Sequence, residues 1–355
     1  MNRWFLGAFS ILFQVCAAYA QEATFGPEFN FTNENLIQAG RALGPSVVNS
    51  DANTAAQKAF LAEVRKKCPD CQAKRIQDKY RIDAFKVQTP EGWSFTIMLD
   101  PWVVEVTTSP MTAKEVARNA PRIQELIFNS ATAVGLYPSQ KTSGHLHIGI
   151  SSAFQRDPHA VRNFIVDWVN HSLATAHAFH WSPANAAPMA AIYTTDSESL
   201  LHRFHKFLGE WDKEYREYLK FLGPETLLSN LFEGMRSEVY VKSYSGFVPF
   251  TKYQNLNVDH FEGFPKEEQT LELRGMREFQ DAEEFARYTE IMQGRIDYLK
   301  NVEILIPVEL ETNQKNRYQI FDEYIYQAKG DVEYARRKST IGTNIPIRIS
   351  CEGLF

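Results

Sequence analysis

Two histidines, His145 and His147, stand one residue apart in an otherwise apolar stretch at 144–150. Side chains of a strand alternate between its two faces, so both imidazoles would share one face, opposite Leu146 and Ile148. Imidazole is a metal ligand and changes its charge near neutral pH. The spacing therefore predicts a strand with one core face and one face able to do chemistry.

Three other strand-like stretches divide polar from apolar side chains in the same way. Their polar faces, with that of 144–150, carry Glu28 and Asn30, Glu105, His145 and His147, and Thr270, Glu272 and Arg274. Carboxylates with imidazole suit Mg²⁺ or Mn²⁺, and a guanidinium nearby suits phosphate or carboxylate. A solvated sheet face is the alternative, although such faces usually carry Lys, Thr, Ser and Gln. If the four stretches pair, they predict a divalent-metal site.

The elements that would position these residues show no βαβ alternation. Strands are expected within 24–31, 79–107, 144–150 and 269–277, and helices at 53–67, 112–134 and 281–300. Thr112 and Glu115 fit a capping box at the start of the second helix. The stretch 159–236 is expected to be mostly helical, with breaks at 181–188 and at Gly223-Pro224; a strand is expected near 242–250, and short helices within 316–338. This order predicts an α+β fold, a mainly antiparallel sheet with helices packed on the outside.

The first twenty residues have the layout of a secretory signal peptide, with Arg3, an apolar run, and Ala18-Tyr19-Ala20 before Gln21. The run is short for a membrane span, and an uncleaved anchor is the alternative. We expect cleavage near Ala20, export to the periplasm or the medium, and no stable membrane insertion afterwards. One domain is expected over 21–355, with a mostly helical section at about 155–240. The formal net charge of -5 over 355 residues gives no reason to expect a nucleic-acid partner, and the oligomeric state stays open.

The four polar motifs, taken in order, resemble those of the glutamine synthetase and glutamate–cysteine ligase superfamily, in particular its amidoligase branch. The Glu-x-Glu pair of those enzymes is similar to FGPEFNF, and their Glu-x-x-(Ser/Thr)-Pro strand is similar to VVEVTTSP. Their glycine-led His-x-His strand is similar to SGHLHIG, and their basic-aromatic segment before Glu-x-Arg is similar to KYQNLNVDHFEG followed by TLELR. The resemblance covers 25–31, 98–150 and 250 to about 300, and leaves 155–245 without a motif.

The resemblance implies a curved antiparallel sheet of glutamine synthetase type, with two or three Mg²⁺ or Mn²⁺ ions between ATP and an acid substrate. Such enzymes make an acyl phosphate, from which an amine displaces phosphate to give an amide. The partners would be a small molecule or peptide with a free carboxylate and an amine co-substrate. By position, the metal ligands would be Glu28, Asn30, Glu105, His145 and Glu272. His147 would lie near the nucleotide phosphates, Arg274 would stabilise the phosphoryl group or hold the acid, and Lys252 would add a point charge.

The sequence departs from the family pattern in ways that keep other functions open. Asn30 stands where the family usually has its second glutamate, which removes one anionic ligand, and Lys252 stands where arginine is frequent. Export would also separate the enzyme from its usual ATP. Two alternatives are an ATP-independent, metal-dependent amide hydrolase or transferase on the same fold, and a non-catalytic protein that binds a peptide or a cell-wall fragment.

The cysteines and the remaining histidine pairs have simpler interpretations. Cys68 and Cys71 could be a redox pair, half of a zinc site or a local disulfide, and export favours the disulfide, which leaves Cys351 odd. No Glu accompanies the helical histidine pairs in an H-E-x-x-H motif, so packing or capping is favoured over metal binding. These pairs are His177 with His180, and His202 with His205.

Overall fold

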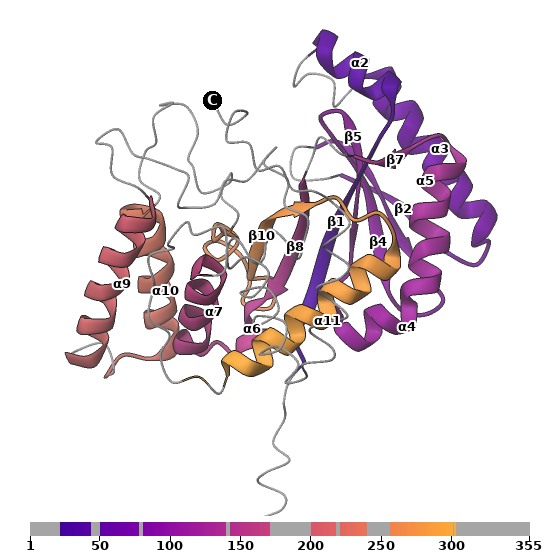
Figure 1. Cartoon of the computed structure of the whole chain (residues 1–355). Helices are drawn as coiled ribbons and strands as arrows, with labels where there is room; N and C mark the ends of the chain where they lie inside the picture. The colour runs from indigo at the N-terminus through magenta and orange to yellow at the C-terminus, as the bar shows by residue number, and fades with distance from the viewer. Residues whose placement is uncertain are drawn as a thin grey trace, which may run out of the picture.

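An open, ten-stranded sheet forms the centre of the computed structural model, which describes residues 22–43, 50–77, 81–139, 143–170, 200–217, 221–239, 256–300 and 302. Its main path runs in the order β2-β3-β4-β5-β1-β8-β10-β9, and every pairing is antiparallel. The short strands β6 and β7 pair with β1. The predicted α+β class with a mainly antiparallel sheet is confirmed (Figure 1). The strands are β1 (Thr24–Thr32), β2 (Gln72–Gln77), β3 (Asp83–Gln88), β4 (Ser94–Asp100), β5 (Val103–Thr108), β6 (Met111–Thr112), β7 (Tyr137–Pro138), β8 (Ser143–Gly149), β9 (Leu256–Asn257) and β10 (Thr270–Arg277).

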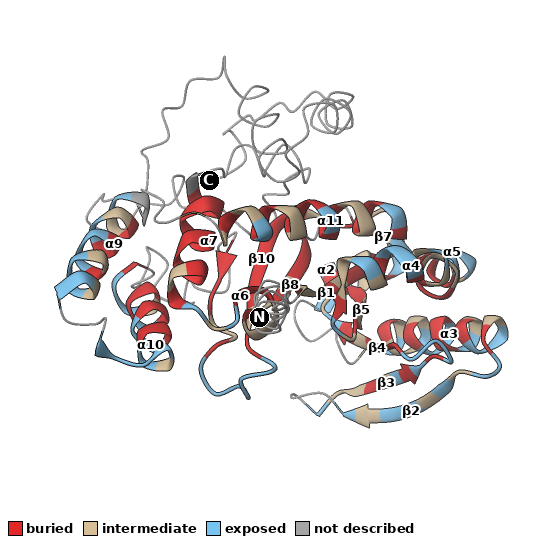
Figure 2. Ribbon diagram, turned by 90° about the horizontal axis from the view of Figure 1, so that it is seen from below, coloured by how far each residue is buried: buried red, intermediate tan, exposed pale blue. Residues whose placement is uncertain are grey.

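Helices cover the apolar face of the sheet, as Figure 2 shows for α3, α4, α5 and α11. The ring of Phe29 on β1 lies 5.0 Å from that of Phe128 and 5.4 Å from that of Phe285, in edge-on contacts. These rings join the sheet to two helical segments, so the opposite face of β1 is left for its polar side chains. The segments on this side are α2 (Glu34–Leu43), α3 (Asp51–Lys67), α4 (Ala113–Ile123), the π-helical η2 (Gln124–Phe128), α5 (Asn129–Ala133) and α11 (Ala282–Leu299).

A second group of helices lies beside the β10 end of the sheet, on the left of Figure 1. Its members are α6 (Ile150–Phe154), α7 (Pro158–Asn170), α9 (Leu200–Glu217), α10 (Pro224–Gly234) and the π-helical η5 (Met235–Val239). Their buried side chains belong to the same hydrophobic cluster as those of the sheet. Helix α10 begins at Pro224, as the break at Gly223-Pro224 predicts. The expected break at 181–188, the strand near 242–250 and the helices within 316–338 lie outside the described residues.

The predicted helix at 112–134 is confirmed as the continuous succession α4, η2 and α5. Its capping box is formed, because the Thr112 hydroxyl accepts from the Glu115 amide at 3.2 Å and the Glu115 carboxylate accepts from the Thr112 amide at 2.8 Å. The cap satisfies two backbone donors that an uncapped helix would leave open. It thereby fixes where the chain leaves β6 and starts across the sheet.

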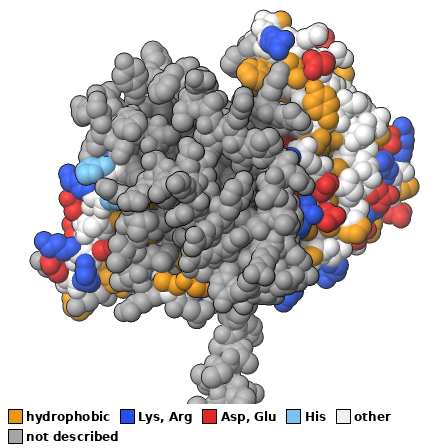
Figure 3. Space-filling view, in the orientation of Figure 1, with side chains coloured by type: hydrophobic (Ala, Val, Ile, Leu, Met, Phe, Trp, Pro, Cys, Tyr) orange, Lys and Arg blue, Asp and Glu red, His pale blue; other side chains and the backbone are white. Residues whose placement is uncertain are grey.

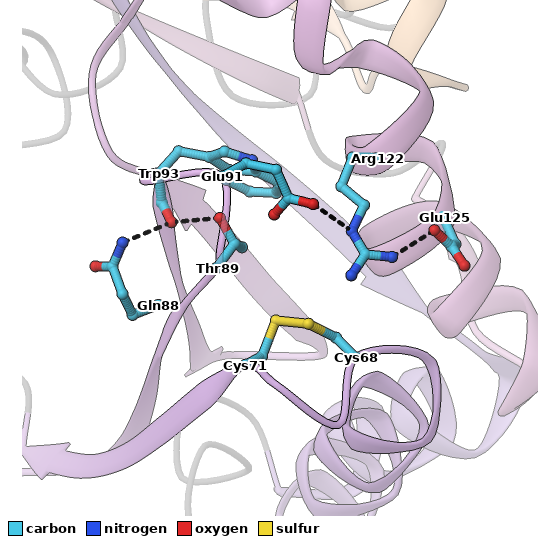
Figure 4. The surroundings of a disulfide bond; sticks show 8 residues. All are labelled: Cys68, Cys71, Gln88, Thr89, Glu91, Trp93, Arg122 and Glu125. Carbon is cyan, nitrogen blue, oxygen red and sulfur yellow. Dashed lines mark hydrogen bonds and ion pairs between the residues drawn. A yellow bond between two sulfur atoms is a disulfide. The ribbon is translucent and has the colours of Figure 1, made fainter.

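The edge strand β2 was not expected from the sequence, and a disulfide precedes it. Cys68 and Cys71 are bonded, with an S–S distance of 2.01 Å, which confirms the local disulfide. Cys68 ends α3 and is almost fully buried, so the bond closes the turn between that helix and β2. Figure 4 shows Arg122 nearby, paired with Glu91 and Glu125. Cys351 lies outside the described residues.

The described surface carries charges of both signs. Figure 3 shows acidic and basic side chains interspersed along its right-hand edge. Many of them pair locally, as Arg287 does with Glu283 at 2.9 Å, and such exposed pairs contribute little to stability. Within the described ranges, no helix is both long enough and apolar enough to cross a membrane.

Candidate metal centre

The four strands that carry the polar motifs are consecutive neighbours in the sheet, in the order β5-β1-β8-β10. Residues directly opposite each other on paired strands share a face. Asn30 is opposite Glu105, and Glu28 is opposite His145. Glu272 is opposite His147. The alternation read from the sequence therefore brings these side chains onto one face, as predicted.

One carboxylate–imidazole group lies at the centre of this face. The Nδ1 atom of His145 is 2.5 Å from Oε2 of Glu28 and 3.4 Å from Oε1 of Glu272. Each of the three residues offers one ligand atom, and these atoms lie within 4.8 Å of one another. His145 and Glu272 are buried, whereas Glu28 is partly exposed. These three ligand atoms are close enough together to hold a divalent cation on the polar face.

A second group lies next to the first and includes a histidine that the sequence did not reveal. His147, His260 and Glu272 also offer three ligand atoms within 4.8 Å of one another. His147 Nδ1 lies 2.9 Å from the Thr270 hydroxyl, and its Nε2 lies 3.0 Å from Glu28. His260 Nε2 lies 3.1 Å from Glu272. Both imidazoles are partly exposed, as is Glu28 of the first group.

Two further side chains hold the carboxylate of Glu272. A nitrogen of Arg274 pairs with its Oε1, and the Asn257 amide donates to its Oε2 at 2.6 Å. Arg274 is 6% exposed, and among the described residues its Nε has no hydrogen-bond partner. A buried donor without a partner is costly. The guanidinium can therefore accept an anionic group of a bound ligand.

Two more carboxyl groups border the first pair. Burial raises the pKa of Glu105 well above its usual range, and repulsion from Glu28 raises it further. Burial likewise raises the pKa of Glu278 well above its usual range, although the polar groups of Asn30 act in the other direction. Glu278 is 1% exposed, and neither of its carboxyl oxygens has a hydrogen-bond partner of normal geometry in the described part of the chain. Both shifts come mainly from burial, which disfavours the ionised carboxylates, and the charge of Glu28 adds to it.

The inner two carboxylates behave in the opposite way. Burial alone would raise the pKa of Glu28, but the charge and hydrogen bonds of His145 and His147 bring it well below the usual value. Burial would also raise the pKa of Glu272, which is lowered by the hydrogen bond from His260 and by nearby positive charge. Burial lowers the pKa of His147, but its bond to Glu28 and the charge of Glu272 outweigh this and raise it. Both carboxylates are therefore ionised, the form that binds a metal.

The predicted site residues divide into three sets. Glu28, His145, Glu272 and Arg274 are in contact, and His147 joins them through Glu28. Asn30 and Glu105 share the face, and Glu105 belongs to neither of the two groups of histidine and carboxylate ligands. Lys252, His177 and His180 lie outside the described residues, and His202 and His205 lie on α9, in neither group.

Sequence reasoning missed His260, Asn257 and Glu278. Asn257 and His260 lie within the segment similar to the family's basic-aromatic motif, which is the signal that could have pointed to them. Glu278 follows the end of β10, where the alternation of strand side chains no longer applies.

Comparison with known proteins adds no family. No protein-family model matches the chain, and no curated protein sequence matches it. The features that bear on function are therefore the geometry of the polar face and the motifs that its strands carry.

Proposed function

We propose that the protein is a divalent-cation-dependent enzyme that joins a carboxylate to an amine at the expense of ATP, on a sheet of glutamine synthetase type. The observation that carries the proposal is the group of Glu28, His145 and Glu272, with the buried guanidinium of Arg274 against it. The adjacency of β5, β1, β8 and β10 supports it, because the resemblance requires these four strands to meet.

The donor set fits a hard or borderline divalent cation. Two carboxylates and one imidazole suit Mg²⁺ or Mn²⁺. Burial and the nearby charge of Glu28 disfavour the ionised forms of Glu105 and Glu278, and a bound cation beside them would favour those forms. A bound divalent cation would offset the charge of the nucleotide phosphates and of the transferring phosphoryl group.

The proposed reaction consists of two displacements. A carboxylate oxygen of the acid attacks the γ-phosphorus of ATP, and the new O–P bond forms as the bond to ADP breaks. The amine then attacks the carbonyl carbon of the acyl phosphate, the C–O bond to phosphate breaks, and the amine proton passes to a carboxylate of the cluster. Arg274 suits the phosphoryl group in both steps, because its planar fork matches phosphate oxygens and its Nε is without a protein partner among the described residues.

A second candidate is an ATP-independent amide hydrolase or transferase that uses the same cation group. The observation that favours it is the signal-like N-terminus, since ATP is scarce outside the cytoplasm. A cation beside Glu28 and Glu272 could assist the attack of water on an amide without any nucleotide.

Thermal unfolding with Mn²⁺ or Mg²⁺, alone and then with ADP or ATP, separates these functions. A ligand that binds only the folded state stabilises it by about 2.7 kcal/mol at a hundred times its Kd. We expect a rise in Tm with metal and a further rise with nucleotide, both lost in Glu272→Gln and both kept in Glu283→Gln, a surface control on α11. A rise with metal alone would favour the ATP-independent enzyme. No rise with either would favour a non-catalytic binding protein.

A further inference from the structure

His260 brings a third imidazole to the polar face from outside the strands. Its backbone carbonyl accepts a hydrogen bond from the Thr270 amide at 3.2 Å, which ties its loop to the start of β10. Its ring centroid lies 4.9 Å from that of His147, with the rings nearly perpendicular. Its Nε2 lies 3.1 Å from Oε2 of Glu272. Two imidazoles thus converge on a carboxylate that also belongs to the first ligand group.

Glu28 and Glu272 each direct their two oxygens toward different imidazoles. Oε2 of Glu28 contacts His145, while its Oε1 lies 3.0 Å from Nε2 of His147. Oε1 of Glu272 is the oxygen nearer His145, while its Oε2 contacts His260. Both carboxylates therefore span from His145 on one side to the His147–His260 pair on the other. Carboxylates placed in this way can bridge two cations, as in two-metal sites.

We propose that His147, His260 and Glu272 form a second cation site, which shares Glu272 with the first and prefers a transition-metal ion such as Mn²⁺ over Mg²⁺. Two imidazoles and one carboxylate make a nitrogen-rich set, whereas Mg²⁺ prefers oxygen ligands and retains water. The Thr270 hydroxyl at 2.9 Å from His147 Nδ1 is the kind of outer partner that orients a metal-binding imidazole. Nε2 of His147, which lies 3.0 Å from Oε1 of Glu28, is then the ring nitrogen that a cation would bind.

The second site rests on the proposed function in one respect only, because both need Glu272. The family pattern loses one anionic ligand at Asn30, and the second site does not need that ligand. Its own ligands come from β8, β10 and the loop after β9, and include neither Asn30 nor Glu105. His147, His260 and Glu28 are partly exposed, whereas His145 and Glu272 are buried.

Mn²⁺ binding to the full chain without nucleotide, followed by electron paramagnetic resonance, counts the ions directly. We expect two Mn²⁺ per chain, one of which excess Mg²⁺ displaces much more readily than the other. His260→Gln retains one, and the matched control His159→Gln, on α7 beside Tyr215, retains two. A single ion in the unaltered protein, or two ions of unchanged affinity in His260→Gln, would overturn the proposal.

Thr270→Val keeps every ligand and tests the site without removing an imidazole. Loss of its hydroxyl should weaken the second Mn²⁺ about 10–100-fold, the usual effect of removing an outer partner, and leave the first unchanged. Equal weakening of both ions, or of neither, would contradict the assignment. Two bound ions without any response to nucleotide would contradict the proposed ligase and support the second site. One bound ion with a response to nucleotide would support the ligase and contradict the second site.

Discussion

Two regions of the molecule bury charged side chains, and they do so in opposite ways. Between α7 and α11, Asp167 and Arg295 are each 1% exposed, and the Arg295 guanidinium contacts both oxygens of the Asp167 carboxylate. Between α7 and α9, Arg162 forms the same fork with Asp212, at 2.9 and 2.5 Å. In these pairs each acid meets a guanidinium of matching shape.

On the polar face of the sheet, four carboxyl groups lie near one another, and the guanidinium of Arg274 pairs with only one of them, that of Glu272. The pairing of each acid with a guanidinium distinguishes a structural ion pair from a candidate binding site. A forked pair satisfies both partners, and its role is to hold two helices together. In the cluster, two carboxyl groups have raised pKa values and the Nε atom of Arg274 has no partner in the described part of the chain, which is the pattern typical of a functional site.

The largest effect is expected from breaking a forked pair. Asp167→Asn should lower the free energy of unfolding by about 3–5 kcal/mol, because it leaves the buried charge of Arg295 uncompensated. Urea denaturation measures the loss. The rise in stability on adding Mn²⁺ should be as large as in the unaltered protein, and a variant that lost the Mn²⁺ response would show that the two regions are not independent.

A smaller loss of stability is expected on removal of the disulfide, which, like the forked ion pairs, has a structural role. Replacing Cys68 and Cys71 together by alanine should cost about 2 kcal/mol, the chain-entropy value for so short a loop. Denaturation with and without Mn²⁺ measures both the stability and the metal response, and only the first should change. A redox function would instead predict that the bond opens reversibly under mild reductant without loss of stability.

A gain is expected where a carboxyl of the cluster is neutralised. Glu105→Gln keeps the shape of the side chain and removes its repulsion with Glu28, so the metal-free protein should become more stable by on the order of 1 kcal/mol at pH 7. The comparison with Asp167→Asn is direct, since both replace an acid by its amide. A loss of several kcal/mol in Glu105→Gln would mean that this acid is paired after all, and the contrast between the regions would fail.

The sequence predicted the polar face well because its signal is local. The period-two alternation in β1, β5, β8 and β10 decides which side chains share a face, and antiparallel pairing then joins them. The capping box at Thr112 likewise marks a helix start within four residues. The strand β2 was not predicted, because its sequence QAKRIQ lies on an exposed edge and has no buried face that would require alternation of apolar and polar residues.

The rest of the site depends on contacts that no local pattern encodes. His260 reaches Glu272 from a loop, and Glu278 reaches Asn30 from beyond the end of β10, after a bulge between Leu273 and Met276 that changes the register by one residue. The close approach of four carboxyl groups on this face becomes visible only when these residues are placed together.

The smallest expected effect is the pH dependence of the metal-free protein, and its sign distinguishes the two regions. An acid whose pKa is raised on folding binds more protons folded than unfolded, so Glu105 and Glu278 make stability fall as pH rises above about 4.5. The raised pKa of His147 acts in the same direction above about 6.5, because its stabilisation is lost as the imidazole deprotonates. Glu28 has a lowered pKa, so its contribution is already complete in this range.

In EDTA, the free energy of unfolding should therefore fall as the pH rises from 5 to 8. In Glu105→Gln this fall should be less steep, by less than about 1 kcal/mol per pH unit. Asp212→Asn, which alters a forked pair instead, should lower the whole curve and keep the slope. With Mn²⁺ present the slope should become less negative or reverse, because the cation and protons compete for the same carboxylates and imidazoles. Equal slopes in the unaltered protein and in Glu105→Gln would mean that Glu105 releases its proton without loss of stability, and its burial would then give no reason to expect a cation beside it.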